Sequence, residues 1–310
     1  MKSLKDYRLV FMGTPKIASK VFEALILEGF NFVALIAQED KPVGRKGILM
    51  PVSTKEVALK YNIPVYQPHR IRLDYDFLNE LKPDLILTMA YGQIVPQAVL
   101  DIPKYGCLNL HGSLLPKYRG AAPIQRAIIE GETKTGITLM EMVDKMDAGR
   151  MYAKEVVEIS ADDNYTSLCD KLSLAAIKIC KDNLLDYLEG KLPGEAQDES
   201  LVTIANKIKP EDEKLDLSKN TFEFVNYVRG LSEEPGGYLL LNNLKFKILK
   251  AHKVSDEINT LGELIVNKRT FLNLKDGVIE LDEVQLEGKK KMDGKSFANG
   301  NRSFNGAILS

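Results

Sequence analysis

Apolar and polar positions follow alternating strand and helix patterns along the first 190 residues. Strand patterns occupy 7–12, 31–38, 84–92, 105–111, 135–143 and 150–159, and apolar residues at helical spacing predict helices over 16–29, 53–62, 122–131 and 167–190. Ser53 is expected to cap the second of these helices. Strands that alternate with helices favour an α/β fold, with a Rossmann-like, mostly parallel sheet covered by helices on both faces.

The pattern changes near residue 190. Residues 191–209 are polar and rich in turn-forming residues, which predicts a linker. After a short helix over 221–231, strand patterns recur at 237–241, 244–254, 262–266, 270–274 and 277–286. Short strands divided by Gly and Asn are typical of a small β-barrel, here expected to be OB-like, or of a sandwich. We therefore expect an α/β domain over 1–190, a linker over 191–209 and a β-barrel domain over 210–310.

The composition excludes several classes of protein. Hydrophobic residues make up 45% and charged residues 27% of the 310, which is ordinary for a globular chain, and the net charge of −1 predicts no global field for nucleic acid. No run reaches the ~18 apolar residues that a membrane-spanning helix needs, and the N-terminus has no secretory, transit or lipidation pattern. The three cysteines are far apart, with no Cys-x-x-Cys, so neither a zinc site nor a disulfide framework is expected. A cytoplasmic enzyme that uses no metal is the natural expectation.

The strand that ends at His111 carries the first candidate chemistry. In CLNLH, residues 107–111, the period of two places Asn109 and His111 on one face, with an amide donor and an imidazole as neighbours at the carboxyl edge of the sheet. Open α/β sheets bind ligands at that edge. The pattern alone leaves two interpretations open: catalysis, or two polar residues that only satisfy local backbone groups, which is the commoner situation.

Longer stretches resemble a known enzyme family. NLHGSLLPKYRGAAPIQRAI at 109–128 is similar to the signature of the folate-dependent formyltransferases, and VFMGTPKIAS, MAYGQIVP, ITLMEMVDKMDAGRM and DESLVTIANK resemble further segments of that family. GAAPIQ is typical of the branch that acts on initiator tRNA. The resemblance implies an enzyme that transfers the formyl group of 10-formyltetrahydrofolate to the α-amino group of methionine on initiator methionyl-tRNA, for the start of translation.

The resemblance also assigns roles to residues. It places Asn109, His111 and Asp147 in the catalytic group, where a tetrahedral oxyanion needs fixed donors and the attacking amine must lose a proton. Asp144 lies nearby in sequence, but it does not occupy the matching position and is better explained as a solvated strand-end carboxylate. The residues that match the family's folate-contacting segments are Ser113, Leu114, Leu115, Pro116, Met89, Tyr91 and Gly92. We expect this folate contact to rest mainly on their backbone.

A basic loop and the tail are the candidates for tRNA contact. Residues 37–53 form a long polar loop without periodicity, and the resemblance implies that Lys41, Arg45 and Lys46 within it reach the acceptor stem; a merely solvated loop is the alternative. The tail is neutral overall, so only its lysine clusters at 245–253 and 289–295 could contact phosphates. The chain has no tryptophan, and Tyr118 stands where the family often has one. We expect a monomer that binds folate and initiator methionyl-tRNA and contacts no membrane.

Four other functions are weighed against this one. A sugar-nucleotide N-formyltransferase shares the Asn-x-His pair and the distant Asp, but GAAPIQ and MGTP fit that branch poorly. A folate-binding or RNA-binding module without catalysis is disfavoured by the intact Asn109, His111 and Asp147. Dinucleotide binding is disfavoured too, because no G-x-G-x-x-G follows the first strand, and the lack of a P-loop argues against nucleotide hydrolysis.

Overall fold

The structure is a computed structural model that describes residues 3–43 and 47–310. By its internal contacts the chain divides into two compact units, and we describe each by itself. The first unit comprises Met1–Gly120, Thr135–Glu158 and Cys169–Ile204, and the second comprises Ala121–Lys134, Ile159–Leu168 and Ala205–Ser310. Two segments from the expected α/β domain over 1–190 therefore belong to the second unit, and most of the expected linker belongs to the first.

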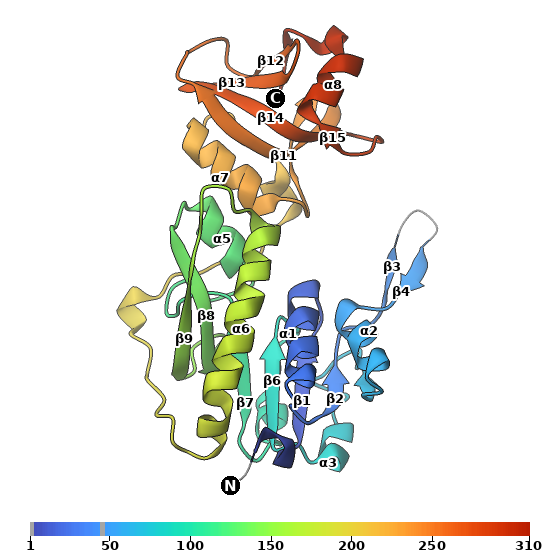
Figure 1. The fold of residues 1–310 in the computed structure, drawn as a ribbon, viewed down its shortest axis with the longest axis vertical. Coiled ribbons are helices and arrows are strands. Elements are labelled where there is room, and N and C mark those ends of the chain that lie inside the picture. The colour runs from blue at the N-terminus through green and yellow to red at the C-terminus, as the bar shows by residue number, and fades with distance from the viewer. Residues whose placement is uncertain (1–2, 44–46) are drawn as a thin grey trace. The chain divides into compact units, whose positions relative to one another are not determined.

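The first unit is built on one seven-stranded sheet (Figure 1). In order across the sheet, the strands are β5 (Val65–Tyr66), β2 (Phe32–Ile36), β1 (Leu9–Gly13), β6 (Leu85–Met89), β7 (Cys107–His111), β8 (Lys134–Glu141) and β9 (Met151–Glu158). The pairs from β5 to β7 are parallel, and β8 runs antiparallel to β7. The predicted mostly parallel sheet is confirmed, with its antiparallel part at the β8 side.

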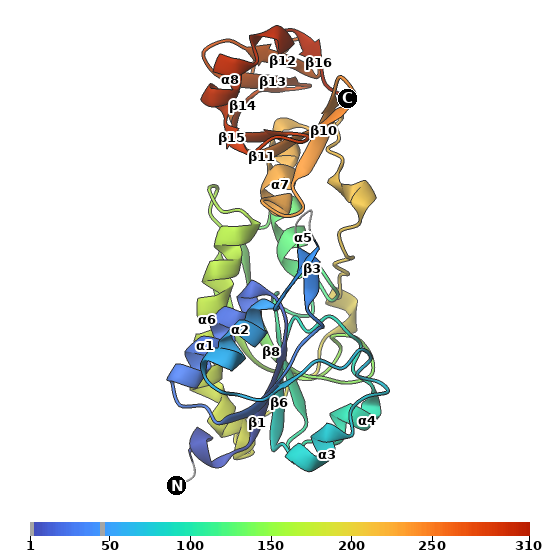
Figure 2. The same ribbon diagram turned by 90° about the vertical axis from the view of Figure 1, so that its right-hand side faces the viewer.

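Helices cover both faces of this sheet, as the alternating pattern predicts. The helices are α1 (Lys16–Leu27), α2 (Ser53–Lys60), α3 (Phe77–Leu81), α4 (Gln97–Leu100) and α6 (Tyr165–Leu188). Figure 2 shows α1, α2 and α6 on one side of β1 and β6, with α3 and α4 on the other. The strand period of two separates the two cores: Phe11 stacks on Phe22 of α1 with ring centroids 4.7 Å apart, whereas Val10 packs with Leu78 of α3 and Val99 of α4. The sheet is thus buried on both faces.

Two local predictions in this unit need correction. The stretch 37–53 is not a loop without structure, because β3 (Lys41–Val43) and β4 (Ile48–Met50) pair antiparallel within it. The three residues of β4 are exposed, so β4 has no buried face whose alternation the sequence could show. Ser53 is not the cap of α2: the helix already includes it, and Val52 holds the N-cap position without a side-chain hydrogen bond.

The second unit contains a curled antiparallel sheet. Its strands run in the order β10 (Gly237–Leu241), β11 (Leu244–Ser255), β14 (Gly277–Leu286), β13 (Thr270–Leu274), β12 (Glu263–Val266) and β16 (Ala307–Ile308), with β15 (Met292–Asp293) paired to β14. Beyond β16, Ser310 exchanges two backbone hydrogen bonds with Leu240 of β10, at 2.7 and 3.1 Å. This exchange joins the two ends of the sheet, so the predicted small barrel-like domain is confirmed.

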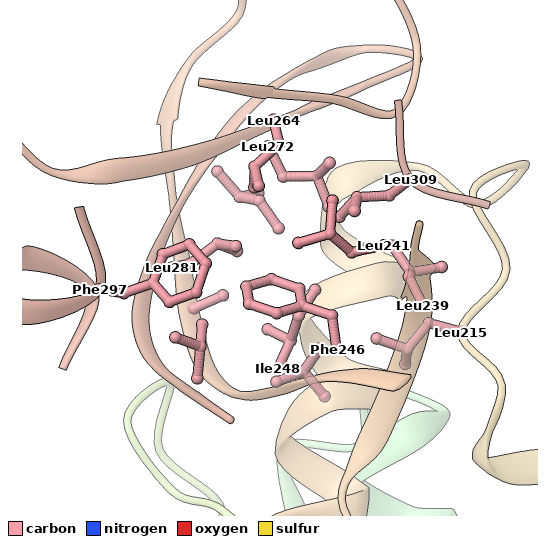
Figure 3. Close-up of a cluster of buried hydrophobic side chains, with 14 of the residues drawn as sticks. Leu215, Leu239, Leu241, Phe246, Ile248, Leu264, Leu272, Leu281, Phe297 and Leu309 are labelled. Atoms are coloured by element: carbon pink, nitrogen blue, oxygen red, sulfur yellow. The ribbon is translucent and has the colours of Figure 1, made fainter. Parts of the chain in front are cut away.

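The inward faces of these strands form one apolar core (Figure 3). Phe246 and Phe297 meet at its centre with ring centroids 5.1 Å apart. The unit also contains α5 (Pro123–Ile129), α7 (Thr221–Leu231) and α8 (Gly294–Gly300). The packing of α5 on α7 is close, because a Cβ at Gly230 would lie 2.5 Å from Ile129 Cγ1. Short 3₁₀ helices occur at Leu4–Asp6, Glu199–Leu201, Pro210–Glu213 and Arg302–Phe304.

Candidate active site

Strand β7 delivers the two polar side chains that the sequence singles out. Asn109 is the register partner of Thr88 on β6 and of Met140 on β8, and His111 is the partner of Thr138 on β8. Being two residues apart on one strand, Asn109 and His111 share a face. The pair therefore stands at the carboxyl end of the parallel strands β6 and β7, where open α/β sheets bind their ligands.

His111 is held in one orientation by its neighbours. Its side chain is 5% exposed, and Nε2 lies 2.8 Å from the backbone oxygen of Tyr118. A carbonyl can only accept a hydrogen bond, so we assign the ring proton to Nε2. Nδ1 then faces Oδ1 of Asp147 at 3.6 Å. The predicted pairing of His111 with Asp147 in space is thereby observed, although the two atoms lie beyond direct hydrogen-bond distance.

Asp147 reaches His111 from a loop between β8 and β9. Its Oδ2 accepts a hydrogen bond of 2.8 Å from the backbone N–H of Gly120, while Oδ1 faces the imidazole. Both Asp147 and Tyr118 have left-handed backbones, with φ of 50° and 62°. Non-glycine residues in this region cost of the order of 1–3 kcal/mol each and persist where the surroundings hold them. Such strain on both sides of one imidazole is typical of a functional site. Asp144, by contrast, is exposed.

Asn109 is the third residue of the candidate catalytic group. Its side chain is partly buried, and its amide makes no hydrogen bond to any residue among 3–43 and 47–310. In the same described part of the chain, the hydroxyl of the adjacent Thr88 is buried without a partner. Buried polar groups are nearly always paired. The partly exposed Asn109 amide is therefore free to donate to a polar ligand beside the buried Thr88 hydroxyl.

The Ser113–Pro116 loop is fixed to β8 by one hydroxyl. Thr138 Oγ1 donates to the backbone oxygen of Ser113 at 2.7 Å and accepts from the N–H of Leu115 at 3.1 Å. The Leu115 side chain is 1% exposed and packs with Met140 and Met151. Sequence reasoning missed Thr138, because a threonine inside a strand gives no signal of its partners.

The other predicted folate residues in this loop differ in exposure. Ser113 is buried and donates from Oγ to the backbone oxygen of Lys117 at 2.6 Å. Leu114 lies against Gly136, where an added Cβ would come within 2.6 Å of Leu114 Cδ2. Leu114 and Pro116 are partly exposed. The loop thus offers part of its backbone and two side chains to a ligand, while Ser113 and Leu115 anchor it.

After the end of β6, a ligand would meet main-chain atoms rather than side chains. Met89 and Tyr91 are 2% and 3% exposed, and burial raises the pKa of the Tyr91 hydroxyl above its usual range. The Tyr91 carbonyl accepts hydrogen bonds from Thr14 Oγ1 at 3.0 Å and Gln38 Nε2 at 3.2 Å. Gly92 is exposed and has a φ of 95°, a conformation that favours glycine. Any folate contact here would involve Gly92 and the neighbouring main chain, as the sequence suggests.

The candidate tRNA-binding residues are only partly visible. Lys41 is exposed on β3, while Arg45 and Lys46 lie outside the described residues. In the second unit, several tail lysines already have partners: Lys245 lies 4.1 Å from the ring centroid of Tyr238, Lys247 donates to the Pro235 carbonyl, Lys253 pairs with Asp256, and Lys291 pairs with Glu233 and Glu283. The sequence pattern could not show these pairings, which leave Lys250, Lys289, Lys290 and Lys295 as the exposed candidates for phosphate contact.

Three further features bear on the range of possible functions. The other two histidines, His69 and His252, lie at the surface beside Glu39 and Asp282. Among the described residues, no group of three or more His, Cys, Asp or Glu side chains could hold a metal ion. Within the same ranges, no helix combines the length and apolar character needed to cross a membrane.

Comparison with known proteins identifies the family. The sequence matches the formyl transferase family over residues 7–182 and the formyl transferase C-terminal domain over residues 207–302. The chain belongs to the formyl transferase family. The expected family is thereby confirmed.

Named relatives of this formyl transferase cover nearly its full length. The methionyl-tRNA formyltransferase of Bacillus subtilis is 42% identical over 308 residues, which are 97% of this chain and 97% of the relative. That of Malacoplasma penetrans is 40% identical over 302 residues, 96% of this chain and 95% of the relative.

Two solved structures share its fold. HypX from Aquifex aeolicus, in complex with tetrahydrofolic acid, has a TM-score of 0.69 at 16% identity, covering 96% of this chain and 47% of that one. The N-formyltransferase from Helicobacter canadensis, in complex with folinic acid and dTDP-3-aminofucose, has a TM-score of 0.67 at 20% identity, covering 89% of this chain and 98% of the other. At these identities the likeness shows a common fold.

The role of Thr138 gives a stability prediction with a matched control. Thr138→Val removes the hydroxyl and leaves the Ser113 carbonyl and the Leu115 N–H unpaired, so we expect the free energy of unfolding to fall by about 1–3 kcal/mol. Thr135 lies on the same strand and is also buried, but its hydroxyl has no partner among the described residues. Thr135→Val should therefore be neutral or stabilising. Urea unfolding of both variants is the measurement, and equal losses would contradict the assigned role of Thr138.

Proposed function

We propose that this chain is a methionyl-tRNA formyltransferase, which transfers the formyl group of 10-formyltetrahydrofolate to the α-amino group of methionyl initiator tRNA. The observation that carries the proposal is the unpaired Asn109 amide beside the His111–Asp147 pair, in a chain 40–42% identical along its length to relatives of that name. The enzyme would work in the cytoplasm as a monomer. Light scattering that gives more than one chain per particle would contradict the monomeric state.

Asn109 is proposed to stabilise the oxyanion. When the amine attacks the formyl carbon, the carbonyl oxygen gains negative charge and needs a fixed donor in a site with little water. The amide N–H of Asn109 can donate without titrating, and no residue in the described part of the chain already occupies it. Removal of one such donor in comparable sites costs about 2.7–4 kcal/mol in the barrier.

His111 and Asp147 are proposed to move the proton. With a proton on Nε2 donated to Tyr118, the lone pair on Nδ1 is free to take the proton that the attacking nitrogen must lose. The resulting imidazolium has an acceptor at each nitrogen, the Tyr118 carbonyl and the Asp147 carboxylate. The same proton then passes to N10 of the folate as the bond between N10 and the formyl carbon breaks. One C–N bond has then formed, one has broken, and His111 is neutral again.

The folate donor is proposed to bind within residues 1–190, whereas the tRNA would also contact the domain that follows. The donor would be held at the Ser113–Pro116 loop and beside Met89, Tyr91 and Gly92, which lie at the carboxyl ends of β6 and β7. We assign catalysis to residues 1–190, and tRNA contact to the domain over 210–310. The chain segment over 191–209 connects them in sequence.

Lys41, Arg45 and Lys46 are proposed to engage the acceptor end of the tRNA. The position of Arg45 and Lys46 between Gly44 and Gly47 in the sequence, and the exposure of Lys41, support the proposal. We expect Arg45→Ala to weaken binding of charged initiator tRNA and to leave the affinity for the folate donor unchanged, because a lost phosphate contact acts only on the nucleic acid. Equal losses for both substrates, measured by titration of each, would assign this residue to the donor site instead.

The decisive experiment offers the enzyme two amines with one donor. Charged initiator tRNA and an amino-sugar nucleotide are each incubated with the chain and 10-formyltetrahydrofolate, and the formylated product is identified by mass. We expect formyl-methionyl-tRNA alone. Formylation of the sugar alone would show that the chain belongs with the sugar N-formyltransferases in function.

The same assay tests the proposed chemistry. Asn109→Ala or His111→Ala should lower the single-turnover rate by ~10²-fold or more, because each removes a group used in the transition state. Binding of the folate donor should stay near that of the unmodified chain. Near-normal turnover by either variant would remove that residue from the catalytic group.

A further inference from the structure

A segment beyond the predicted α/β domain holds both loops that surround His111. We call residues 195–204 the strap. Its first residue, Glu195, exchanges two backbone hydrogen bonds of 2.8 Å with Met151. Near its other end, Thr203 accepts a hydrogen bond from the Arg119 N–H at its carbonyl and one from the Tyr118 N–H at Oγ1, both at 2.9 Å. The strap therefore contacts the loop that carries Tyr118 and the end of the loop that carries Asp147.

Between these two anchors, the Gln197 amide makes four hydrogen bonds. Its Nε2 donates to the carbonyls of Asp147 and Gly149, at 2.8 and 2.9 Å. Its Oε1 accepts from Arg119 Nε at 3.0 Å and Nη2 at 2.8 Å. Two carbonyls on one side and a guanidinium on the other fix the orientation of the amide. A carboxylate could replace the acceptor but would repel both carbonyls, and an alkyl group would remove all four hydrogen bonds.

Arg119, which binds the Gln197 side chain, is itself held by a second residue of the strap. The residue is 2% exposed, and its guanidinium also binds Glu199 of the strap, with Nη2 2.9 Å from Oε1. Hydrogen bonds from Arg119 and from Lys145 lower the pKa of Glu199 to about 2. The carboxylate therefore stays charged across the whole range in which enzymes are assayed, and the buried guanidinium keeps its counter-charge.

The carbonyl that Gln197 holds belongs to Asp147 itself. Asp147 has a φ of 50°, and Gly149, two residues on, is so tightly placed that a Cβ there would lie 2.0 Å from the Glu141 carbonyl. A loop in this conformation depends on its surroundings. Gln197 fixes its backbone on one side, and the Gly120 N–H fixes the carboxylate on the other.

We propose that Gln197 is a positioning residue for formyl transfer: it sets the Asp147 carboxylate opposite His111 by joining the Asp147 loop to Arg119. The inference rests on the proposed function of this site. Gln197 touches no reacting atom, so its effect passes through Asp147. A displacement of about 1 Å in a catalytic group can cost ~10²-fold in rate.

The test is a double-mutant cycle on the full chain. Gln197→Glu should lower the single-turnover formylation rate by about 10–100-fold and leave donor affinity unchanged. In an Asp147→Asn background the same substitution should have almost no further effect, because the group that it misplaces is already gone. Glu195→Gln is the matched control, since it makes the reverse exchange at an exposed strap residue and should leave the rate unchanged. Gln197→Met repeats the test without a new charge.

Independent effects of the two substitutions, multiplying in the double variant, would overturn the proposal. Amide hydrogen exchange gives a second measurement that needs no substrate. Gln197→Glu should speed exchange of the Gly120 N–H, which is bonded to Asp147, whereas Glu195→Gln should not. Unchanged exchange would also overturn the proposal. If the unmodified chain formylates no tRNA, the proposed function fails, and the exchange result still decides whether Gln197 positions Asp147.

Discussion

The Asp147 carboxylate joins the separate parts of the candidate site. One oxygen accepts the Gly120 N–H at 2.8 Å and the other faces His111 Nδ1 at 3.6 Å. Through Gly120 it is linked to the loop whose Tyr118 carbonyl holds the other ring nitrogen. The imidazole thus lies between two acceptors from two loops, and its position depends on the distance between those loops.

Hydrogen bonds from residues far apart in sequence fix the distance between the two loops. Thr138 on β8 ties the Ser113–Pro116 loop to the sheet, and Gln197 ties the Asp147 loop to Arg119. Each of these side chains makes hydrogen bonds to buried groups of the loops it joins, and a buried polar group that loses its partner costs about 1–3 kcal/mol. Beside His111, the Asn109 amide and the hydroxyl of its neighbour Thr88 have no partner within the described part of the chain. An oxyanion site requires donors that are held in place and are not already used by the protein.

Much of this arrangement can be predicted from sequence, and the rest cannot for physical reasons. Period-two alternation identifies β7 and the shared face of Asn109 and His111, and the order of apolar segments predicts the parallel sheet and the barrel. The β3–β4 hairpin gives no signal because its β4 residues are exposed. The partners of Arg119, Gln197 and the tail lysines cannot be predicted, since these pairings arise only when distant segments meet. The left-handed backbone of Asp147 is equally invisible, because nothing in an aspartate requires it.

The protonation of His111 tests the central claim most directly. The proposed chemistry requires that the neutral ring carry its proton on Nε2, bonded to Tyr118, and keep Nδ1 free for the proton in transfer. Nitrogen-15 NMR of the imidazole, assigned by comparison with a His111→Gln chain, separates the two tautomers. We predict that the neutral ring carries its proton on Nε2 and leaves Nδ1 unprotonated. A neutral ring protonated on Nδ1 would contradict the mechanism.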